Sequence, residues 1–203
     1  MTAPPGLHEV QLRFRIRASA DAAWAALHSP AVLAALYAPV LVVEPLTHAD
    51  EESLLHSAVR LRLFGVVPVG TQLIGAYDET REHRGETVRI LRDSGIPLTG
   101  PLASLDVWDH RMAVSPLPDG RTLWRDRLVF GGPGSALLLP VLWAAWQWRG
   151  WRIRRLARGW DRAAARSDDG PTGADLAPVS RRRGLRRAPR AWRGGSAPRT
   201  PRA

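Results

Sequence analysis

The sequence contains no cysteine and no lysine among its 203 residues. The lack of cysteine rules out disulfide bonds, thiolate ligands for a metal and a catalytic thiol. All 29 basic residues are therefore arginine, and 17 prolines accompany them. One explanation of the arginine excess is a coding bias toward GC-rich codons.

Long hydrophobic runs are also missing. The longest apolar run covers residues 136–146, and as a helix it would be roughly 16 Å long against a hydrocarbon core of about 30 Å. The first eleven residues contain neither the basic nor the apolar region of a secretory signal. We therefore expect a cytoplasmic protein that meets a membrane, if at all, only at its surface.

Recognisable catalytic and cofactor motifs are absent as well. The sequence has no phosphate-binding loop, dinucleotide fingerprint or serine nucleophile elbow. No histidine stands one helical turn from another, and no paired carboxylates accompany the histidines at ligand spacing. We expect neither a metal nor a cofactor. The six histidines are His8, His28, His48, His56, His83 and His110.

The formal net charge of +10 is concentrated at one end of the chain. Residues 1–148 have 13 arginines and 15 acidic residues, whereas residues 177–203 have 9 arginines and no acidic residue. From residue 167 onward glycine, proline, serine and arginine dominate, which predicts one domain over 1–166 and a disordered tail over 167–203. The tail is a candidate for binding an anionic membrane surface or nucleic acid.

Residues 135–166 form the one long helical pattern of the chain. Apolar residues recur there every three or four positions, which is typical of a helix with one buried face. Such a helix must be covered, and we expect a curved sheet to fold around it. The predicted buried positions are Leu139, Trp143, Trp146, Gly150, Ile153, Ala157 and Trp160.

The chain before this helix reads as strands with two short helices. Residues 10–16 alternate between apolar and charged, as in a half-buried strand. Ser19 and Ser29 offer N-cap oxygens and Pro30 suits a first helical position, so we expect two short helices, the second ending near residue 38. Further strands are predicted at 40–46, 55–63, 72–77 and 87–92, with a turn at 65–70 and a charged loop at 78–86.

Residues 103–130 predict a hairpin with a defined register. The string LPDGR at 117–121 is typical of a three-residue turn with glycine in the left-handed position. This turn places eight residues on one face, where His110 and Asp126 become diagonal neighbours among apolar side chains. The predicted cross-strand pairs are Val114 with Trp124, Met112 with Asp126, His110 with Leu128, and Trp108 with Phe130.

The order of these elements resembles that of the START-like helix-grip superfamily, also called SRPBCC, which includes polyketide cyclases and lipid-transfer domains. The strings that carry the resemblance are RFRIRASADAAWAAL, LFGVVPVGTQ, WDHRM followed by TLWRDRLVF, and GGPGSALLL followed by WRGWRIRRL. The resemblance covers roughly residues 8–166. It implies an α+β fold in which seven antiparallel strands curve around a long C-terminal helix, with two short helices after the first strand.

The resemblance also implies a cavity between sheet and helix that holds an apolar or amphipathic small molecule. A solid core would use the same apolar residues, so the polar pair within this set is the distinguishing feature. The expected lining is Val10, Leu12, Phe14, Leu61, Leu63, Trp108, His110, Met112, Trp124, Asp126, Leu128, Phe130, Trp143, Trp146 and Ile153.

His110 and Asp126 admit three roles. A buried carboxylate needs a partner, which could be His110, an arginine, water or a ligand. The two residues could form a structural pair, orient the polar end of a ligand, or act in general acid/base chemistry.

Trp148 and Trp151 lie opposite the predicted buried face, among arginines. They could be indoles with guanidinium groups stacked on a solvated face, or they could form an interfacial surface that meets anionic lipid.

The leading hypothesis is a non-catalytic protein that binds a hydrophobic small molecule. One alternative is a polyketide cyclase or dehydratase-like enzyme that uses His110 and Asp126. Another is a peripheral adaptor that attaches to anionic membranes or nucleic acid through its arginine-rich C-terminus.

Overall fold

The computed structural model of the chain describes residues 6–46, 57–83 and 85–168. The predicted tail, 167–203, lies outside the described residues from 169 onward, and residues 167 and 168 are the last of a helix. The predicted strand at 55–63 likewise lies partly outside, because its description begins at residue 57.

The strands form two antiparallel sheets. The larger sheet has the order β1-β8-β7-β6-β5 and the smaller one the order β2-β3-β4. Their bounds are β1 Leu7–Ile16, β2 Leu41–Pro45, β3 Ala58–Leu63, β4 Val67–Leu73, β5 Ala76–His83, β6 Glu86–Asp93, β7 Val107–Pro116 and β8 Thr122–Gly131.

The prediction of a single seven-stranded sheet is therefore wrong. The outer edge of β4 pairs with the segment 96–99 instead of with β5: Leu73 and Ile96 exchange backbone hydrogen bonds of 2.9 and 3.0 Å, and Leu98 N donates to Thr71 O at 2.8 Å. The two backbones approach so closely that any side chain at Gly95 would collide with the Leu73 carbonyl. The sheet is interrupted between β4 and β5 for this reason.

The same interruption explains three local errors of prediction. The predicted turn at 65–70 contains the start of β4, and the predicted strand at 72–77 is divided between β4 and β5. The charged segment at 78–86 is mostly β5, an edge strand of the larger sheet, instead of a loop. Charged side chains are ordinary on an edge strand, where they hinder pairing with other chains, so composition did not separate strand from loop here.

The two short helices begin where the sequence predicted. In α1 (Ala20–Leu27) the Ser19 hydroxyl accepts from the Ala22 amide at 3.2 Å, and in α2 (Pro30–Tyr37) the Ser29 hydroxyl accepts from the Val32 amide at 3.3 Å. A short 3₁₀ helix, η2 (Pro101–Ser104), precedes β7. The starts of α1 and α2 are thus set by local serine caps.

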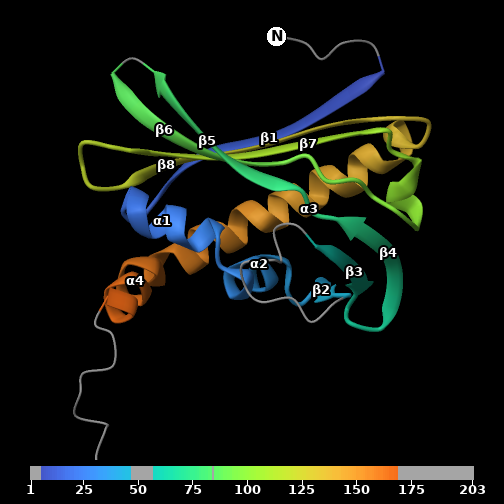
Figure 1. The fold of residues 1–203 in the computed structure, drawn as a ribbon, viewed down its shortest axis with the longest axis horizontal. Helices are drawn as coiled ribbons and strands as arrows, with labels where there is room; N and C mark the ends of the chain where they lie inside the picture. Colours follow the sequence, from blue (N-terminus) through green and yellow to red (C-terminus); the bar gives the residue numbers. More distant parts are fainter. Residues whose placement is uncertain (1–5, 47–56, 84, 169–203) are drawn as a thin grey trace, which may run out of the picture. The chain divides into compact units, whose positions relative to one another are not determined.

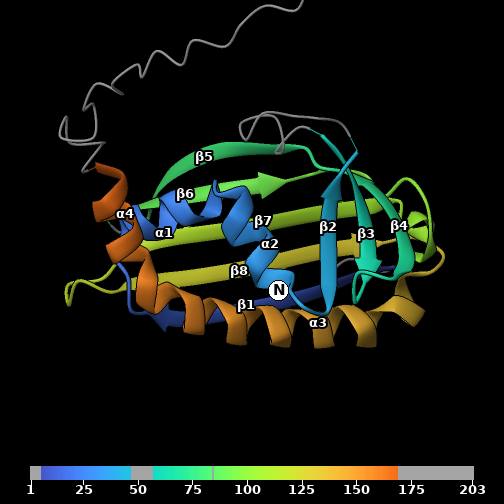
Figure 2. The ribbon, with the colours of Figure 1, turned by 90° about the horizontal axis from the view of Figure 1, so that it is seen from below.

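The long C-terminal helix is present but not continuous. It consists of α3 (Ser135–Leu156), the 3₁₀ turn η3 (Ala157–Gly159) and α4 (Trp160–Asp168). Figures 1 and 2 show α3, α1, α2 and the smaller sheet on the same side of the larger sheet, with α3 running beside β1. The core lies between these elements and the larger sheet.

From Trp146 onward the buried face of the C-terminal helix is the predicted one, because Trp146, Gly150, Ile153, Ala157 and Trp160 are all buried, but the first half of α3 differs. Leu142, Trp146 and Ile153 are buried, whereas Trp143 is 57 % exposed. At 3.6 residues per turn, Leu142 lies one full turn before Trp146 and close to its line, and Trp143 lies to one side. The predicted burial of Trp143 is therefore wrong.

The orientation of the first half of α3 can be tested with a matched pair of substitutions. Trp146→Ala should lower the free energy of unfolding by about 3–5 kcal/mol, because it opens a cavity in the core. Trp143→Ala should change it by about 0.5 kcal/mol or less, as expected of a surface site. Urea unfolding followed by far-UV circular dichroism measures both, and equal losses would contradict the observed orientation of α3.

Candidate functional site

The hairpin of β7 and β8 has the register that the sequence predicted. All four predicted cross-strand pairs are observed, including His110 with Leu128 and Met112 with Asp126. His110 and Asp126 are both buried, at 4 % and 0 % exposure. The turn chemistry at 117–121 thus places a histidine and a carboxylate together in the interior.

Three side chains surround the buried Asp126 carboxylate. The His110 ring nitrogen Nε2 lies 2.8 Å from Oδ1, and the Trp146 indole donates to the same oxygen at 3.1 Å. The Arg149 Nε–H group donates to Oδ2 at 2.7 Å. Asp126 therefore connects the β7–β8 hairpin to two residues of α3.

These contacts decide the charge of Asp126. Burial by itself raises the pKa of a carboxyl group, but the charge of Arg149, followed by the charge and hydrogen bond of His110, outweighs it. The pKa of Asp126 consequently lies well below its ordinary value, and the carboxylate stays ionised.

Arg149 is the site residue that the sequence reasoning missed. It is 1 % exposed, its Nη2 lies 2.9 Å from the Met112 sulfur, and its guanidinium carbon lies 5.2 Å from the centre of the Tyr37 ring. Two features of the sequence could have predicted this role for Arg149. A buried Asp126 needs a cationic partner. Arg149 follows Trp146 by three positions, so the two side chains lie on the same side of the helix.

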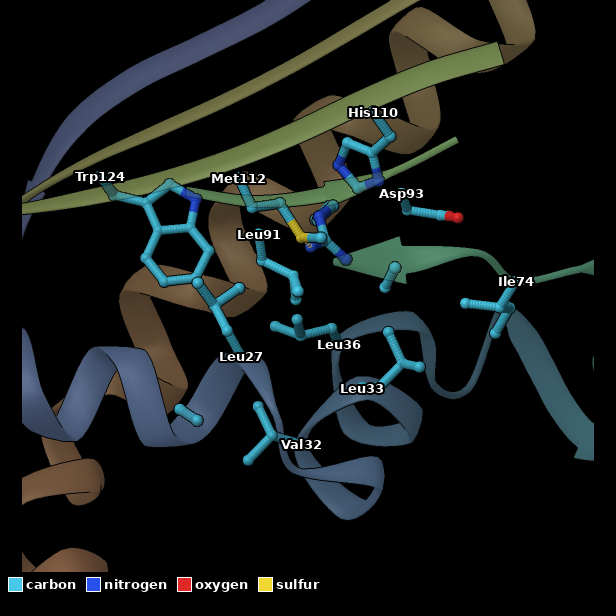
Figure 3. A pocket seen from close by; sticks show the side chains of 13 residues that line it. Leu27, Val32, Leu33, Leu36, Ile74, Leu91, Asp93, His110, Met112 and Trp124 are labelled. Carbon is cyan, nitrogen blue, oxygen red and sulfur yellow. Dashed lines mark hydrogen bonds between the residues drawn. The ribbon is translucent and has the colours of Figure 1, made fainter. Parts of the chain in front are cut away.

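Beside this network lies a small cavity of about 60 Å³. Figure 3 shows side chains of α1 and α2, such as Leu27 and Leu36, facing Trp124, Met112 and His110 from the sheet. The full lining is Ala26, Leu27, Val32, Leu33, Leu36, Ile74, Ala76, Leu91, Asp93, His110, Met112, Trp124 and Arg149.

Only three of the residues expected at the cavity line it: His110, Met112 and Trp124. Leu128, Phe130 and Trp146 pack with Val10 and with Leu142 in a solid cluster under the N-terminal half of α3, against which Leu12 and Trp108 pack. Ile153 belongs to the main core, and Phe14 packs against that core. Leu61 belongs to the core cluster of the smaller sheet, and Leu63 is half-buried in β3. Asp126 does not line the cavity itself but contacts His110, which does.

The cavity thus differs in place from the expected one. Side chains of α3 pack against the larger sheet in the cluster around Trp146, and the cavity lined by Arg149 lies under α1 and α2. Sequence reasoning placed no residue of α1 or α2 in the lining, because nothing in their own pattern shows which element they cover.

Polar groups in this cavity differ in how they are used. The Asp93 carboxylate accepts from the backbone amides of Gly75 and Gly95, both at 3.0 Å. The Nη1 group of Arg149 and the indole Nε1 of Trp124 are buried and have no hydrogen-bond partner in the protein. The cavity wall therefore includes two residues with a spare donor.

A second depression, of about 340 Å³, lies on the segment 94–97 and the start of β7. Its charged residues include Arg92 and Asp109, which form an ion pair with each other. Trp108 also lines this depression, and its indole Nε1 is buried without a hydrogen-bond partner.

Two further properties concern the described part of the chain only. No group of three or more histidine, aspartate or glutamate side chains stands there in an arrangement that could hold a metal ion. None of the helices described is long and apolar enough to cross a bilayer.

Comparison with known proteins gives structural similarity only. No family model and no curated protein matches the sequence. A point mutant of norcoclaurine synthase from Thalictrum flavum, solved with a transition-state analogue, is 13% identical with a TM-score of 0.52, and the match covers 74% of this chain and 94% of that one.

Two other solved structures give similar values. A truncated norcoclaurine synthase from the same plant is 12% identical, with a TM-score of 0.51 and coverage of 74% and 92%. The protein CV1439 from Chromobacterium violaceum is 18% identical, with a TM-score of 0.49 and coverage of 74% and 96%.

The similarity to the two norcoclaurine synthase structures, with TM-scores of 0.52 and 0.51, defines the class of the fold. The chain has an α+β fold of the helix-grip type, in which a large antiparallel sheet covers a long C-terminal helix. Fold similarity at this level of identity does not transfer an activity.

The charged network makes a prediction about acid stability. Because the folded-state pKa of Asp126 is below the ordinary value of about 3.9, its contribution to stability is complete above about pH 4 and is lost as pH falls toward the folded pKa. Asp126→Asn should lower the free energy of unfolding at pH 7 by about 3–5 kcal/mol. The gap between the variant and the unmodified protein should narrow below pH 4.

Denaturant unfolding between pH 2.5 and 7 measures this gap, and a gap that is independent of pH would contradict the network. As a control, Asp126→Leu combined with Arg149→Met should be more stable than Asp126→Leu alone, because the double variant leaves no buried charge unpaired.

Proposed function

We propose that the protein binds a small, mainly apolar molecule with one hydrogen-bond-accepting group in the cavity beneath α1 and α2, and that it does so without catalysis. The observation that supports this most is the pair of spare donors on the apolar wall, Arg149 Nη1 and Trp124 Nε1. A buried donor without a partner costs about 1–3 kcal/mol. A ligand oxygen that accepts from either donor would recover that cost.

The ligand's polar group follows from the charges around it. Arg149 is paired with Asp126 through Nε, and the backbone amides of Gly75 and Gly95 both donate to Oδ1 of Asp93. The two buried groups of the cavity lining without a partner are N–H donors, so the ligand group that suits them is an acceptor such as a carboxylate or a carbonyl. A carboxylate makes the stronger bond to a guanidinium.

The size of the cavity limits how the ligand enters. A volume of about 60 Å³ holds only a few atoms, whereas pockets for drug-sized ligands measure about 300–1,000 Å³. A longer apolar chain requires α2 to move outward. Of the α2 side chains that line the cavity, Val32 and Leu33 are half-buried and Leu36 is buried, so this movement would chiefly uncover Leu36.

Binding can be tested with decanoate and decanol, which have equal chains and different head groups. We expect decanoate to bind about tenfold or more tightly, because only it offers a charged acceptor to the guanidinium. Ala76→Leu fills the cavity from β5 and should abolish binding, whereas Ala103→Leu, at an exposed site outside the cavity, should not. Isothermal titration calorimetry measures all six combinations of the two compounds with the unmodified protein and the two variants.

Equal binding of both compounds would contradict the proposed polar contact, and binding that survives Ala76→Leu would contradict the proposed place. If Ala76→Leu also destabilises the fold by more than the roughly 1–3 kcal/mol expected of overpacking, the smaller Ala76→Val substitution takes its place.

A second candidate function is supported by the orientation of His110. Its Nε2 is held by Asp126, and the ring lines the cavity, so Nδ1 is the nitrogen left for general acid/base chemistry on a bound molecule. Asp126 itself does not line the cavity, and it would act only by positioning the ring. This arrangement would suit a polyketide cyclase-like enzyme.

His110→Gln separates the two candidates. If the protein is an enzyme, this substitution should abolish conversion of a linear poly-β-ketone while leaving decanoate binding in place. Conversion that is unaffected by the substitution, or absent in the unmodified protein, removes the second candidate. Chromatography of the reaction products measures the conversion.

A further inference from the structure

The outward face of α3 is apolar over its first four turns. Leu137, Val141 and Trp151 are 82 %, 62 % and 47 % exposed, and Trp143 beside them is 57 % exposed. Leu137, Val141, Ala144, Trp148 and Trp151 follow one another at spacings of four and three residues, so they form one stripe along the helix. We call these five residues the outer stripe.

The outer stripe is unusual for a helix at a protein surface. Residues 135–148 contain no charged side chain at all, although the opposite face of the same helix already supplies the core with Leu142 and Trp146. A helix that is apolar all round is normally covered on all sides. The outer stripe therefore points to an additional partner.

The character of this face changes along the helix. Beyond Trp151, the exposed side chains include Arg155 in the last turn of α3, Arg158 in the 3₁₀ turn η3 and Arg162 in α4. The Trp148 and Trp151 rings lie 5.1 Å apart at this boundary, and the Arg155 guanidinium lies 5.5 Å from the Trp151 ring centre. The sequence that follows adds nine arginines and no acidic residue over 177–203.

We propose that the outer stripe and the arginines that follow it form a surface that docks on an anionic lipid bilayer. The apolar residues would enter the interface, the tryptophans would lie at headgroup level, and the arginines would meet the lipid phosphates. Each arginine close to such a surface adds to the attraction. The charge of the helix end and tail is thus complementary to the partner.

Two other partners fit this face less well. In a two-fold dimer through the stripe, parallel helices would set arginine against arginine, and antiparallel helices would set arginine against the apolar half. Nucleic acid would use the arginines but leave Leu137 and Val141 uncovered. An anionic bilayer offers an apolar interior to the outer stripe and phosphate groups to the arginines.

This surface is independent of the cavity. The outer stripe faces away from the larger sheet, whereas the cavity lies under α1 and α2 on the inner side of α3. The two proposals therefore succeed or fail separately.

Co-sedimentation of the full-length protein with vesicles tests the proposal. Binding to vesicles that contain phosphatidylglycerol should exceed binding to pure phosphatidylcholine, and it should weaken with salt. Leu137→Gln combined with Val141→Gln should weaken binding at least about tenfold, since two apolar side chains no longer enter the interface. Both sites are exposed, so the fold should be unaffected.

Matched control variants distinguish the contribution of the outer stripe to vesicle binding from non-specific hydrophobic adsorption and from the contribution of the tail. Val66→Gln combined with Ile96→Gln removes two equally exposed apolar residues elsewhere and should leave vesicle binding unchanged. The triple variant Arg155→Gln, Arg158→Gln and Arg162→Gln should weaken vesicle binding. A separate tail variant should also weaken vesicle binding without abolishing it; it combines Arg181→Gln, Arg182→Gln, Arg183→Gln, Arg186→Gln and Arg187→Gln.

The proposal fails if the stripe variant sediments like the unmodified protein, if only the tail variant loses binding, or if no vesicles are bound. Binding to an oligonucleotide with no binding to vesicles would overturn it in favour of nucleic acid. A dimer in light scattering that the stripe variant loses, again without vesicle binding, would overturn it in favour of a second copy of the chain.

Discussion

The buried charge of Asp126 is the constraint on which the interior depends. A carboxylate that is fully removed from water is tolerated only with several partners, and here they come from β7 (His110) and from α3 (Trp146 and Arg149). The network therefore fixes how far along the sheet α3 lies and how it is rotated about its own axis. Apolar contacts alone would allow several rotations, because the first half of α3 is apolar on all sides.

The same network divides the interior into two parts. On one side, Leu128, Phe130, Leu142 and Trp146 interlock into a solid cluster. On the other side, the side chain of Arg149 borders a small cavity under α1 and α2. The Arg149 guanidinium donates to the Asp126 carboxylate through Nε, and its Nη1 group has no hydrogen-bond partner. Structural and ligand-binding roles of this group are therefore compatible, since they use different N–H groups.

Both faces of the first half of α3 are apolar because that half of the helix contains no charged residue. A stretch with no charge supplies the core on one side and leaves an equally apolar stripe on the other. A partner that covers the stripe would remove the energetic cost of exposing it to water, and the arginines further along the helix are the reason for proposing an anionic lipid surface.

Local patterns in the sequence determined the elements and their local geometry. The caps at Ser19 and Ser29 and the turn at 117–121 depend on residues only a few positions apart, so the two short helices and the register that pairs His110 and Asp126 could be read directly. The tertiary structure alone decided the split of the sheet at β4, the rotation that buries Leu142 and exposes Trp143, the burial of Arg149 and the position of the cavity. Each of these depends on which surfaces, distant in sequence, meet and compete for the same space, and no local spacing encodes that competition.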